Sequence, residues 1–190
     1  MKILIGITGA TGAIFGIRLL EVLSGIKAIE THLIVSLSGE QTIGFETAYK
    51  MDAIRAMASR WYRVDDIGAC VASGSFRHDG MIIAPCSMKT LAALAHSYAD
   101  NLLTRAADVT LKERRKLLLL VRETPLHLVH LKNMVTVTEM GGIIMPPVPA
   151  FYHGPESIRD IIDHTIGKAL DLFDIEHDLF KRWPGPGTIL

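Results

Sequence analysis

Residues 117–125 read LLLLVRETP, five apolar residues that end directly in a charged pair, Arg122 and Glu123. An apolar run this short, bounded by charge, is typical of a β-strand buried on both faces of a parallel sheet. The end of such a strand delivers the next side chains to the rim of the core. In α/β folds that rim is where ligands bind, so this stretch predicts both a fold class and the place of a site.

Strand and helix patterns alternate on both sides of this run. We expect further strands at 2–7, 31–35, 81–84 and 143–145, and helices at 12–23, 38–49, 52–60, 87–96, 100–109, 125–140 and 155–174. The expected N-cap residues are Ser38, Asp52, Ser87 and Asp100, and Pro85 is expected to end its strand. Leu128, Leu131, Met134 and Val135 form the expected apolar stripe of the helix that begins at Pro125. This βα alternation predicts an α/β fold with a doubly wound, mostly parallel sheet and helices on both faces.

Length and composition limit the possible classes. A chain of 190 residues fits a single domain, 1–190, and its net charge of zero gives no global field that would attract nucleic acid or a membrane. The hydrophobic fraction of 49% and the mean hydropathy of +0.30 are high for a domain of this size, which predicts a homo-oligomer. Two cysteines without metal-like spacing favour a reducing, cytoplasmic setting. No apolar run approaches transmembrane length, and glycines interrupt the apolar N-terminus, which argues against a signal peptide.

Polar or backbone-exposing residues follow each expected strand, at 8–12, 36–38, 86–90, 122–123 and 146–152. Parallel strands share one carboxyl edge, so these five segments are expected to converge on a single crevice.

Gly6, Gly9 and Gly12 form a tight turn between the first strand and the first helix. Such a turn exposes backbone amides and a helix N-terminus to an anion, although a close-packed turn without a ligand has the same pattern. A dinucleotide site would need an acidic residue after the second strand, where the chain has Ser36 and Ser38. A mononucleotide such as FMN therefore fits better than NAD, and no P-loop motif is present.

Three other groups of residues suggest chemistry less strongly. The segment 85–90 offers hydroxyls and amides at a helix start, and an ordinary N-cap would look the same. In the basic stretch 105–116, Arg105 and Lys112 lie seven residues apart and could share a helix face. His127 and His130 have a metal-compatible spacing but only two ligands, so exposed helical histidines explain them more simply. Cys86 is better explained as a small buried residue than as a nucleophile.

Four segments together resemble one known family: GITGATGAIFGIRLL, ASGSFRHDGMIIAPCSMKTLA, NLLTRAADVTLKERRKLLLLVRETPL and MPPVPAFYHGPESI. They are similar to the flavin prenyltransferases of the UbiX type, formerly described as phenylacrylic or aromatic acid decarboxylase subunits. The resemblance covers nearly the whole chain. It implies a flavodoxin-like, Rossmann-like, homododecameric and cytoplasmic flavoprotein. Its activity would be a metal-independent transfer from dimethylallyl phosphate to N5 and C6 of reduced FMN, and the prenylated FMN would serve UbiD-type decarboxylases.

The same resemblance assigns residues to roles. The implied flavin contacts are Gly9, Ala10, Thr11, Gly12, Ser36, Ser87, Met88, Lys89, Thr90, Arg105 and Arg122. The implied dimethylallyl phosphate contacts, drawn from more than one subunit, are Lys112, Arg122, Glu123, Tyr152 and Lys168. Lys112, Arg122 and Glu123 are the implied catalytic residues. Preorganised cations can stabilise a departing phosphate without a metal, and the anionic Glu123 is better suited to carrying a proton.

A few positions depart from the family pattern. Thr11 stands where serine is usual, and Lys168 stands where some members have arginine, which keeps the charge but not the bidentate fork. Glu46 matches a carboxylate near the flavin in relatives. For the tail, about 175–190, packing on a neighbouring subunit and packing on its own chain both remain open. Three alternatives also remain: an FMN-dependent aromatic acid or cysteine decarboxylase, a non-catalytic flavin carrier, and a NAD-binding oxidoreductase.

Overall fold

A computed structural model describes residues 1–183 and 185. The chain divides into two compact units, Met1–Pro146 and Pro147–Leu190. The expectation that 1–190 act as one domain stays a prediction. No helix in the described part of the chain is long and apolar enough to cross a membrane.

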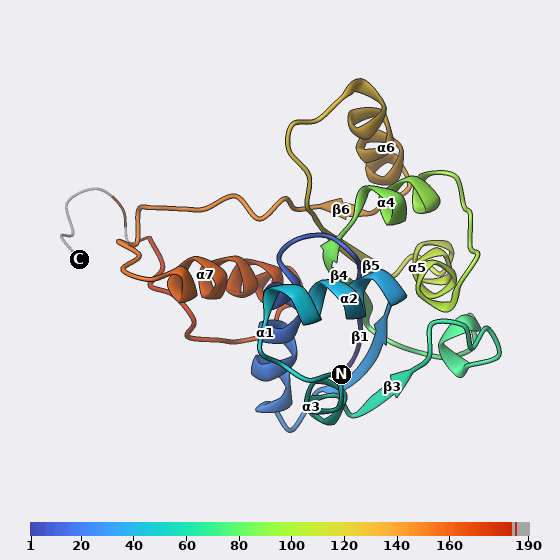
Figure 1. The fold of residues 1–190 in the computed structure, drawn as a ribbon, viewed down its shortest axis with the longest axis horizontal. Coiled ribbons are helices and arrows are strands. Elements are labelled where there is room, and N and C mark those ends of the chain that lie inside the picture. Colours follow the sequence, from blue (N-terminus) through green and yellow to red (C-terminus); the bar gives the residue numbers. More distant parts are fainter. Residues whose placement is uncertain (184, 186–190) are drawn as a thin grey trace. The chain divides into compact units, whose positions relative to one another are not determined.

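A parallel sheet of six strands forms the centre of the first unit (Figure 1). The strands are β1 (Lys2–Ile7), β2 (Glu30–Val35), β3 (Arg60–Tyr62), β4 (Gly80–Cys86), β5 (Lys116–Val121) and β6 (Ile143–Ile144). Their order is β3-β2-β1-β4-β5-β6, and every pairing is parallel. Without the three-residue edge strand β3, the other five follow the order of a flavodoxin-like sheet. The predicted doubly wound, flavodoxin-like α/β fold is confirmed.

Helices cover both faces of this sheet. The helices of the first unit are α1 (Ala13–Ser24), α2 (Leu37–Glu46), α3 (Met51–Met57), α4 (Met88–Ala95), α5 (Leu102–Lys112) and α6 (Leu128–Glu139), with a 3-10 turn η1 (Cys70–Ala72). Leu117 and Leu119 of β5 belong to a buried cluster with α4, α5 and α6. On the other face α1 packs closely, because a side chain at Gly16 would lie 2.2 Å from the Ala84 carbonyl. The LLLL run is fully buried because both faces are covered.

Several helix starts differ from the sequence prediction by one or two residues. Ser36, not Ser38, caps α2, and its Oγ accepts from the Gly39 amide at 3.0 Å. Asn101, not Asp100, caps α5 with a capping box, and Lys50 precedes α3 without a side-chain cap in place of Asp52. Neighbouring residues that can all cap compete, and the geometry at the strand end decides between them. The predicted helix over 52–60 was also too long, since β3 begins at Arg60.

Pro85 does not end its strand, contrary to the prediction. It lies inside β4, where the register with β5 shifts between Ile83 and Cys86. A proline has no amide to donate, so it is tolerated at such an irregularity. Its carbonyl accepts from both the amide and the hydroxyl of Thr8, at 3.2 and 2.8 Å.

Helix α6 was predicted with the wrong start, and its apolar stripe is not the face that the first unit buries. It begins after His127, whose Nδ1 accepts from the amides of Val129 and His130, rather than at Pro125. The expected stripe is largely exposed, because Leu128, Leu131 and Val135 keep 65%, 45% and 56% of their surface accessible. Asn133 and Val137 face inward instead. The stripe is real, but the first unit does not cover it.

The second unit is built on α7 (Ile158–Asp171) and the tail that follows it. Ser157 and Asp160 form a capping box at its start, so the helix is shorter than the predicted 155–174. The tail packs onto the helix at Gly167, where a side chain would lie 2.5 to 2.6 Å from the rings of Phe180 and His177. The tail up to residue 183 is therefore seated on its own chain's helix.

Candidate functional site

A cavity of about 270 Å³ opens at the carboxyl edge of the sheet in the first unit. Its walls come from the ends of three strands: β1, β4 and β5. The lining residues are Gly9, Ala10, Thr11, Ser87, Met88, Arg122, Glu123 and Thr124. Segments more than 100 residues apart in sequence thus meet in one place, as the shared edge of parallel strands requires.

Thr8 joins two of these strand ends. Its hydroxyl donates to the Pro85 carbonyl at 2.8 Å and accepts from the Ser87 amide at 2.9 Å. Thr8 is 1% exposed; its bond to Pro85 is buried and its bond to Ser87 is partly buried. The glycine turn after β1 and the polar start of α4 therefore keep a fixed separation.

Arg122 is held against the glycine turn from both its backbone and its side chain. Its amide donates to the Cys86 carbonyl at 3.0 Å, and its Nε donates to the Thr11 carbonyl at 3.1 Å. A side chain at Gly12 would lie 3.4 Å from the Arg122 Nε, so glycine leaves room for this approach. Because Nε is fixed on the Thr11 carbonyl, the other N–H groups of the Arg122 guanidinium are held at the cavity wall.

Glu123 lies beside Arg122 but is exposed. One carboxylate oxygen accepts from the amide of Thr124 at 3.0 Å. Glu123 also lines the cavity. A carboxylate in such a setting can accept or deliver a proton.

Glu46 occupies the N-terminus of α1, which the sequence predicted to face an anionic ligand. Its Oε2 accepts from the amides of Gly12 and Ala13 at 2.8 and 3.1 Å. Burial opposes its ionisation, but hydrogen bonds from Thr11, Gly12 and Ala13 and the charge of Arg122 together hold the pKa of Glu46 below its ordinary value. The anion at this helix end is a side chain of the chain itself, because Gly12 has no side chain to cap the helix.

A second, smaller cavity of about 30 Å³ lies beside the first and shares Ser87 with it. Hydroxyls, one amine, one side-chain amide and one carboxylate, that of Asp100, make up most of its wall: Ser36, Ser38, Ser87, Lys89, Thr90, Asp100, Asn101 and Thr104, with Ala93 and Leu103. Ser36 and Ser38 lie 3.2 Å apart through their Oγ atoms, and Ser87 and Thr90 lie 3.1 Å apart. Ser38 lies in the strand-end segment 36–38 that was expected to reach this crevice, but the sequence did not assign it a ligand contact. Asn101 and Thr104 were missed as site residues, because the expected helix cap was Asp100 and the start of that helix was not expected at the site.

Arg105 and Lys112 are not at these cavities. Arg105 donates to the carbonyl of Ala72 and pairs with Asp108 at 3.0 Å. Lys112 ends α5 and pairs with Glu113 over Gly74. The start of α5 lines the small cavity, so its last residue lies roughly 15 Å farther along the helix, toward the other edge of the sheet. Within one subunit the structure does not bring Lys112 to Glu123.

Tyr152 and Lys168 belong to the second unit. The Tyr152 hydroxyl lies 2.8 Å from Nε2 of His164, and Lys168 lies 3.5 Å from a carboxylate oxygen of Asp171. Both are partly accessible, with 42% of Tyr152 and 53% of the Lys168 side chain exposed.

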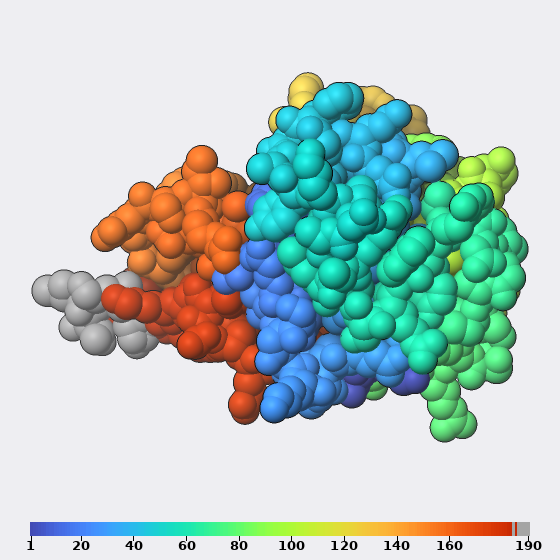
Figure 2. Space-filling view, turned by 60° about the horizontal axis from the view of Figure 1, so that its bottom comes forward, coloured from blue at the N-terminus to red at the C-terminus, as the bar shows by residue number. Residues whose placement is uncertain are grey.

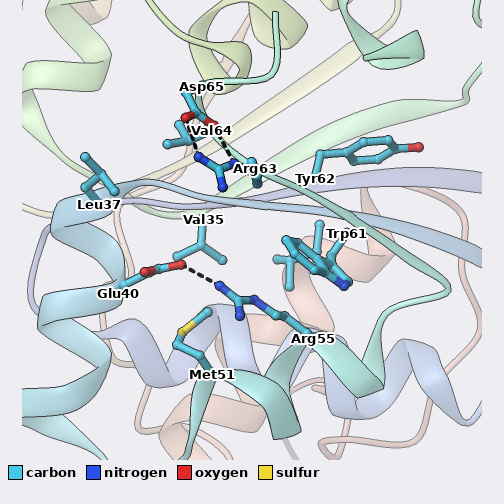
Figure 3. Close-up of a pocket in the computed structure, with 11 residues that line it drawn as sticks. Val35, Leu37, Glu40, Met51, Arg55, Trp61, Tyr62, Arg63, Val64 and Asp65 are labelled. Carbon is cyan, nitrogen blue, oxygen red and sulfur yellow. Dashed lines mark hydrogen bonds and ion pairs between the residues drawn. The ribbon is translucent and has the colours of Figure 1, made fainter. Parts of the chain in front are cut away.

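A larger cavity, of about 380 Å³, lies elsewhere in the first unit, between β2, α2, α3 and β3. In Figure 3 the Arg55 guanidinium lies between the Glu40 carboxylate, 3.0 Å away, and the Trp61 ring, 4.5 Å from its centroid. Arg63 pairs with Asp65 at 2.7 Å. In Figure 2 the α2, α3 and β3 segments form one continuous surface, coloured cyan to green. Because Arg55 and Arg63 already pair with carboxylates of the same cavity, the two smaller polar cavities are the better sites for a charged ligand.

Three residues considered from the sequence have structural roles. Cys86 is fully buried, and that burial raises the pKa of its thiol, so it is not a ready nucleophile. His127 and His130 stack at 3.5 Å between ring centroids, and His127 caps α6.

Comparison with known proteins points to one family. The family model Flavoprotein matches residues 1–181. The flavin prenyltransferase UbiX of Thauera aromatica is 55% identical over 185 residues, which cover 97% of this chain and 95% of that protein. A dodecameric FMN-dependent UbiX-like decarboxylase from Escherichia coli O157:H7 has a TM-score of 0.96 at 48% identity, covering 97% of this chain and all of that one. AnUbiX, solved with FMN and dimethylallyl pyrophosphate, has a TM-score of 0.95 at 51% identity, with 97% of each chain covered.

Proposed function

The chain belongs to the UbiX-type flavin prenyltransferases, a Flavoprotein family, and from this premise we propose how its own residues perform the transfer. The enzyme is a transferase that joins a dimethylallyl group to FMN. We propose dimethylallyl phosphate as the donor, N5 and C6 of the reduced flavin as the acceptor atoms, and Lys112, Arg122 and Glu123 as the catalytic residues.

One observation carries this assignment: Arg122 and Glu123 enter the same cavity as the glycine turn and the start of α4. A cation fixed beside a freely accessible carboxylate supplies both needs of the reaction. The cation stabilises charge on a departing phosphate, and the carboxylate moves a proton. Each charge-assisted contact to the phosphate would contribute about 1.5 to 3 kcal/mol.

The residues at the carboxyl edge fit FMN. The hydroxyls of Ser36, Ser38, Ser87 and Thr90, with the Lys89 amine, form a small cradle suited to a phosphate group. We propose the adjoining cavity of about 270 Å³, lined by Thr11, Met88 and Arg122 among others, for the flavin ring. When bound, reduced FMN supplies the nucleophilic N5 and the C6 carbon. Gly9 is required here, because a side chain would lie 2.4 Å from Ser38.

Within this cavity the chain's residues divide the work. Arg122 holds the donor's phosphate next to the flavin edge, since its Nε is already fixed on the Thr11 carbonyl. Glu123 takes a proton from the flavin side and delivers it to the departing phosphate. Glu46 holds the glycine turn in place through the amides of Gly12 and Ala13.

The remaining phosphate contacts are proposed to come from other subunits. Lys112 lies far from Glu123 in its own subunit, and a dodecameric relative supports an oligomer in which sites lie between copies. Tyr152 and Lys168 would complete the phosphate site. Arg105 would act near the flavin of a neighbouring copy, because its own unit engages it with Ala72 and Asp108.

The test is anaerobic incubation of the purified protein with reduced FMN and dimethylallyl phosphate, followed by mass spectrometry of the flavin. We expect the flavin mass to rise by one dimethylallyl group. A parallel reaction with dimethylallyl pyrophosphate, the ligand of AnUbiX, tests which donor is used. A flavin of unchanged mass with both donors, in protein saturated with FMN, would overturn the proposal.

A second function is considered because the Escherichia coli O157:H7 neighbour is described as an FMN-dependent decarboxylase. Carbon dioxide release from an aromatic acid by this chain alone, with no change in flavin mass, would favour that activity. We further propose that the product passes to a UbiD-type decarboxylase in the cytoplasm. Restoration of activity to an apo decarboxylase by the reaction mixture would test that transfer.

A further inference from the structure

Helix α7 carries a line of polar side chains. The line includes one proposed phosphate ligand, Lys168, and contacts the other, Tyr152, through His164. His164, Lys168 and Asp171 lie at i, i+4 and i+7, on one face of the helix. At one end, Nε2 of His164 lies 2.8 Å from the Tyr152 hydroxyl. At the other end, Asp171 lies 3.5 Å from Lys168 and accepts two hydrogen bonds from Arg182. Side chains of this face thus contact both Tyr152 and Lys168.

His164 is placed rigidly. It is 7% exposed, and its ring stacks parallel on that of His153, with centroids 4.7 Å apart. The ring of Phe180, from the tail, lies 4.6 Å away on a tilted plane. Burial, followed by the charges of His153 and Lys168, lowers the pKa of His164, so the ring is neutral at neutral pH.

A neutral imidazole has one N–H group and one bare nitrogen, and the choice decides what Tyr152 can do. If Nε2 is bare, the Tyr152 hydroxyl donates its only proton to His164. If Nε2 carries the proton, His164 donates to the phenolic oxygen and the hydroxyl proton is free. Phosphate oxygens only accept, so Tyr152 can bind a phosphate only in the second arrangement.

We propose that His164 is a positioning residue, whose Nε2–H donates to Tyr152 and thereby commits the Tyr152 hydroxyl proton to the phosphate of the prenyl donor. This inference rests on the proposed function, in which Tyr152 contacts that phosphate. His153 and Phe180 fix the plane of the ring. The tail thus contributes to the phosphate site through His164, without touching the phosphate itself.

Two isosteric substitutions separate donation from packing. In His164→Gln the side-chain amide can still donate to Tyr152, whereas His164→Met fills similar space without a donor. Binding of dimethylallyl phosphate to the full-length protein loaded with oxidised FMN is measured by calorimetry. We expect the Kd to rise about tenfold in His164→Met and to stay within about threefold of wild type in His164→Gln. Thermal unfolding and FMN affinity should match between the two variants.

A double-mutant cycle shows whether His164 acts through Tyr152. In a Tyr152→Phe background, His164→Met should have no further effect on the Kd or on the KM of turnover, because the group that it positions is gone. An equal additional loss in that background would mean an independent structural role and would overturn the inference.

The remaining outcomes are also decisive. If wild-type protein prenylates FMN and His164→Met binds the donor as tightly as wild type, the inference fails while the proposed function stands. If wild-type protein neither binds the donor nor changes the flavin mass, the proposed function fails first and this inference with it. A loss of donor affinity in His164→Gln as large as in His164→Met would show that packing, not donation, is what matters.

Discussion

Glu123 differs from the other residues of the main cavity in being held only by its own loop. Arg122 is fixed on two carbonyls, whereas Glu123 accepts from the adjacent Thr124 amide and is otherwise accessible. A proton carrier needs such freedom, because its carboxylate must meet two partners in turn. Arg122 is thus held at two points and Glu123 at one, which suits Arg122 to positioning and Glu123 to proton transfer.

Glu123→Gln is expected to bind FMN normally but to turn over about 10² to 10⁴-fold more slowly, because an amide cannot carry the proton. Single-turnover formation of prenylated FMN, followed by mass spectrometry, measures the rate. Glu139→Gln, an exposed change on α6, is the matched control and should keep the parental rate. Parental turnover in Glu123→Gln would exclude the proton role.

Gly9→Ala tests the close approach of the glycine turn to α2. The added methyl group would lie 2.4 Å from both Cβ and Oγ of Ser38, so one segment must move. We expect a loss of about 1 to 3 kcal/mol in the free energy of unfolding and weaker FMN binding. Gly44→Ala is the control, since a side chain there meets nothing within 4 Å. Urea unfolding and flavin fluorescence titration measure the two effects, and equal stability of both variants would contradict the prediction.

At the scale of elements, the site depends on how strand ends are joined. Thr8→Val removes the hydroxyl that links β1 to β4 and leaves the partly buried Ser87 amide without its partner. The expected cost is about 1 to 3 kcal/mol in the free energy of unfolding, with a fall in FMN affinity because the start of α4 loses its anchor.

Thr110→Val is a matched control for Thr8→Val. Thr110 is equally buried, but its hydroxyl donates only to the Ala106 carbonyl within α5. We expect a smaller loss of stability and unchanged FMN affinity. If the two variants weaken FMN binding equally, the link between β1 and β4 is not what positions the flavin site.

The α7–tail contact has a defined pH dependence. Hydrogen bonds from Arg182 contribute most to lowering the pKa of Asp171 to about 2. The charges of Arg182 and His177 also lower this pKa, whereas burial acts in the opposite direction. A carboxyl group whose pKa is lower in the folded than in the unfolded chain stabilises the folded state at pH values above its unfolded pKa of about 4. This contribution disappears as the pH falls toward the folded-state pKa of about 2. Asp171→Asn should therefore cost about 2 kcal/mol near pH 7 and progressively less between pH 4 and 2. Urea unfolding at several pH values measures this, and a pH-independent difference would contradict the assignment.

Sequence patterns predicted element types better than they predicted caps and faces. The LLLL strand and the meeting of strand ends followed from hydrophobic runs and from parallel topology, which are properties of the chain itself. Ser36 was preferred over Ser38, and Asn101 over Asp100, because three-dimensional geometry chose among adjacent capping residues. Glu46 was found through resemblance alone, since no local pattern indicates which carboxylate will cap α1 from another helix.

At the scale of the whole molecule, the face of α6 defined by Leu128, Leu131 and Val135 links the composition to assembly. Three large apolar side chains at i, i+3 and i+7 are 45% to 65% exposed, on a chain whose hydrophobic fraction is 49%. A relative with 48% identity is dodecameric. We therefore expect this α6 face to be covered by a second copy of the chain.

Leu131→Asp places a charge at the centre of this α6 face and should reduce the assembly to smaller species, because an unpaired carboxylate is costly in a buried interface. Light scattering coupled to size-exclusion chromatography measures the mass, and Lys132→Asp, on the neighbouring exposed position, is the control for charge alone. If sites lie between copies, Leu131→Asp should also lose prenylation out of proportion to its loss of stability, since Lys112 could no longer reach another copy's Glu123. A Leu131→Asp protein that keeps the parental mass would show that the α6 face is not an interface. One that dissociates yet retains full turnover would show that a single copy completes the site.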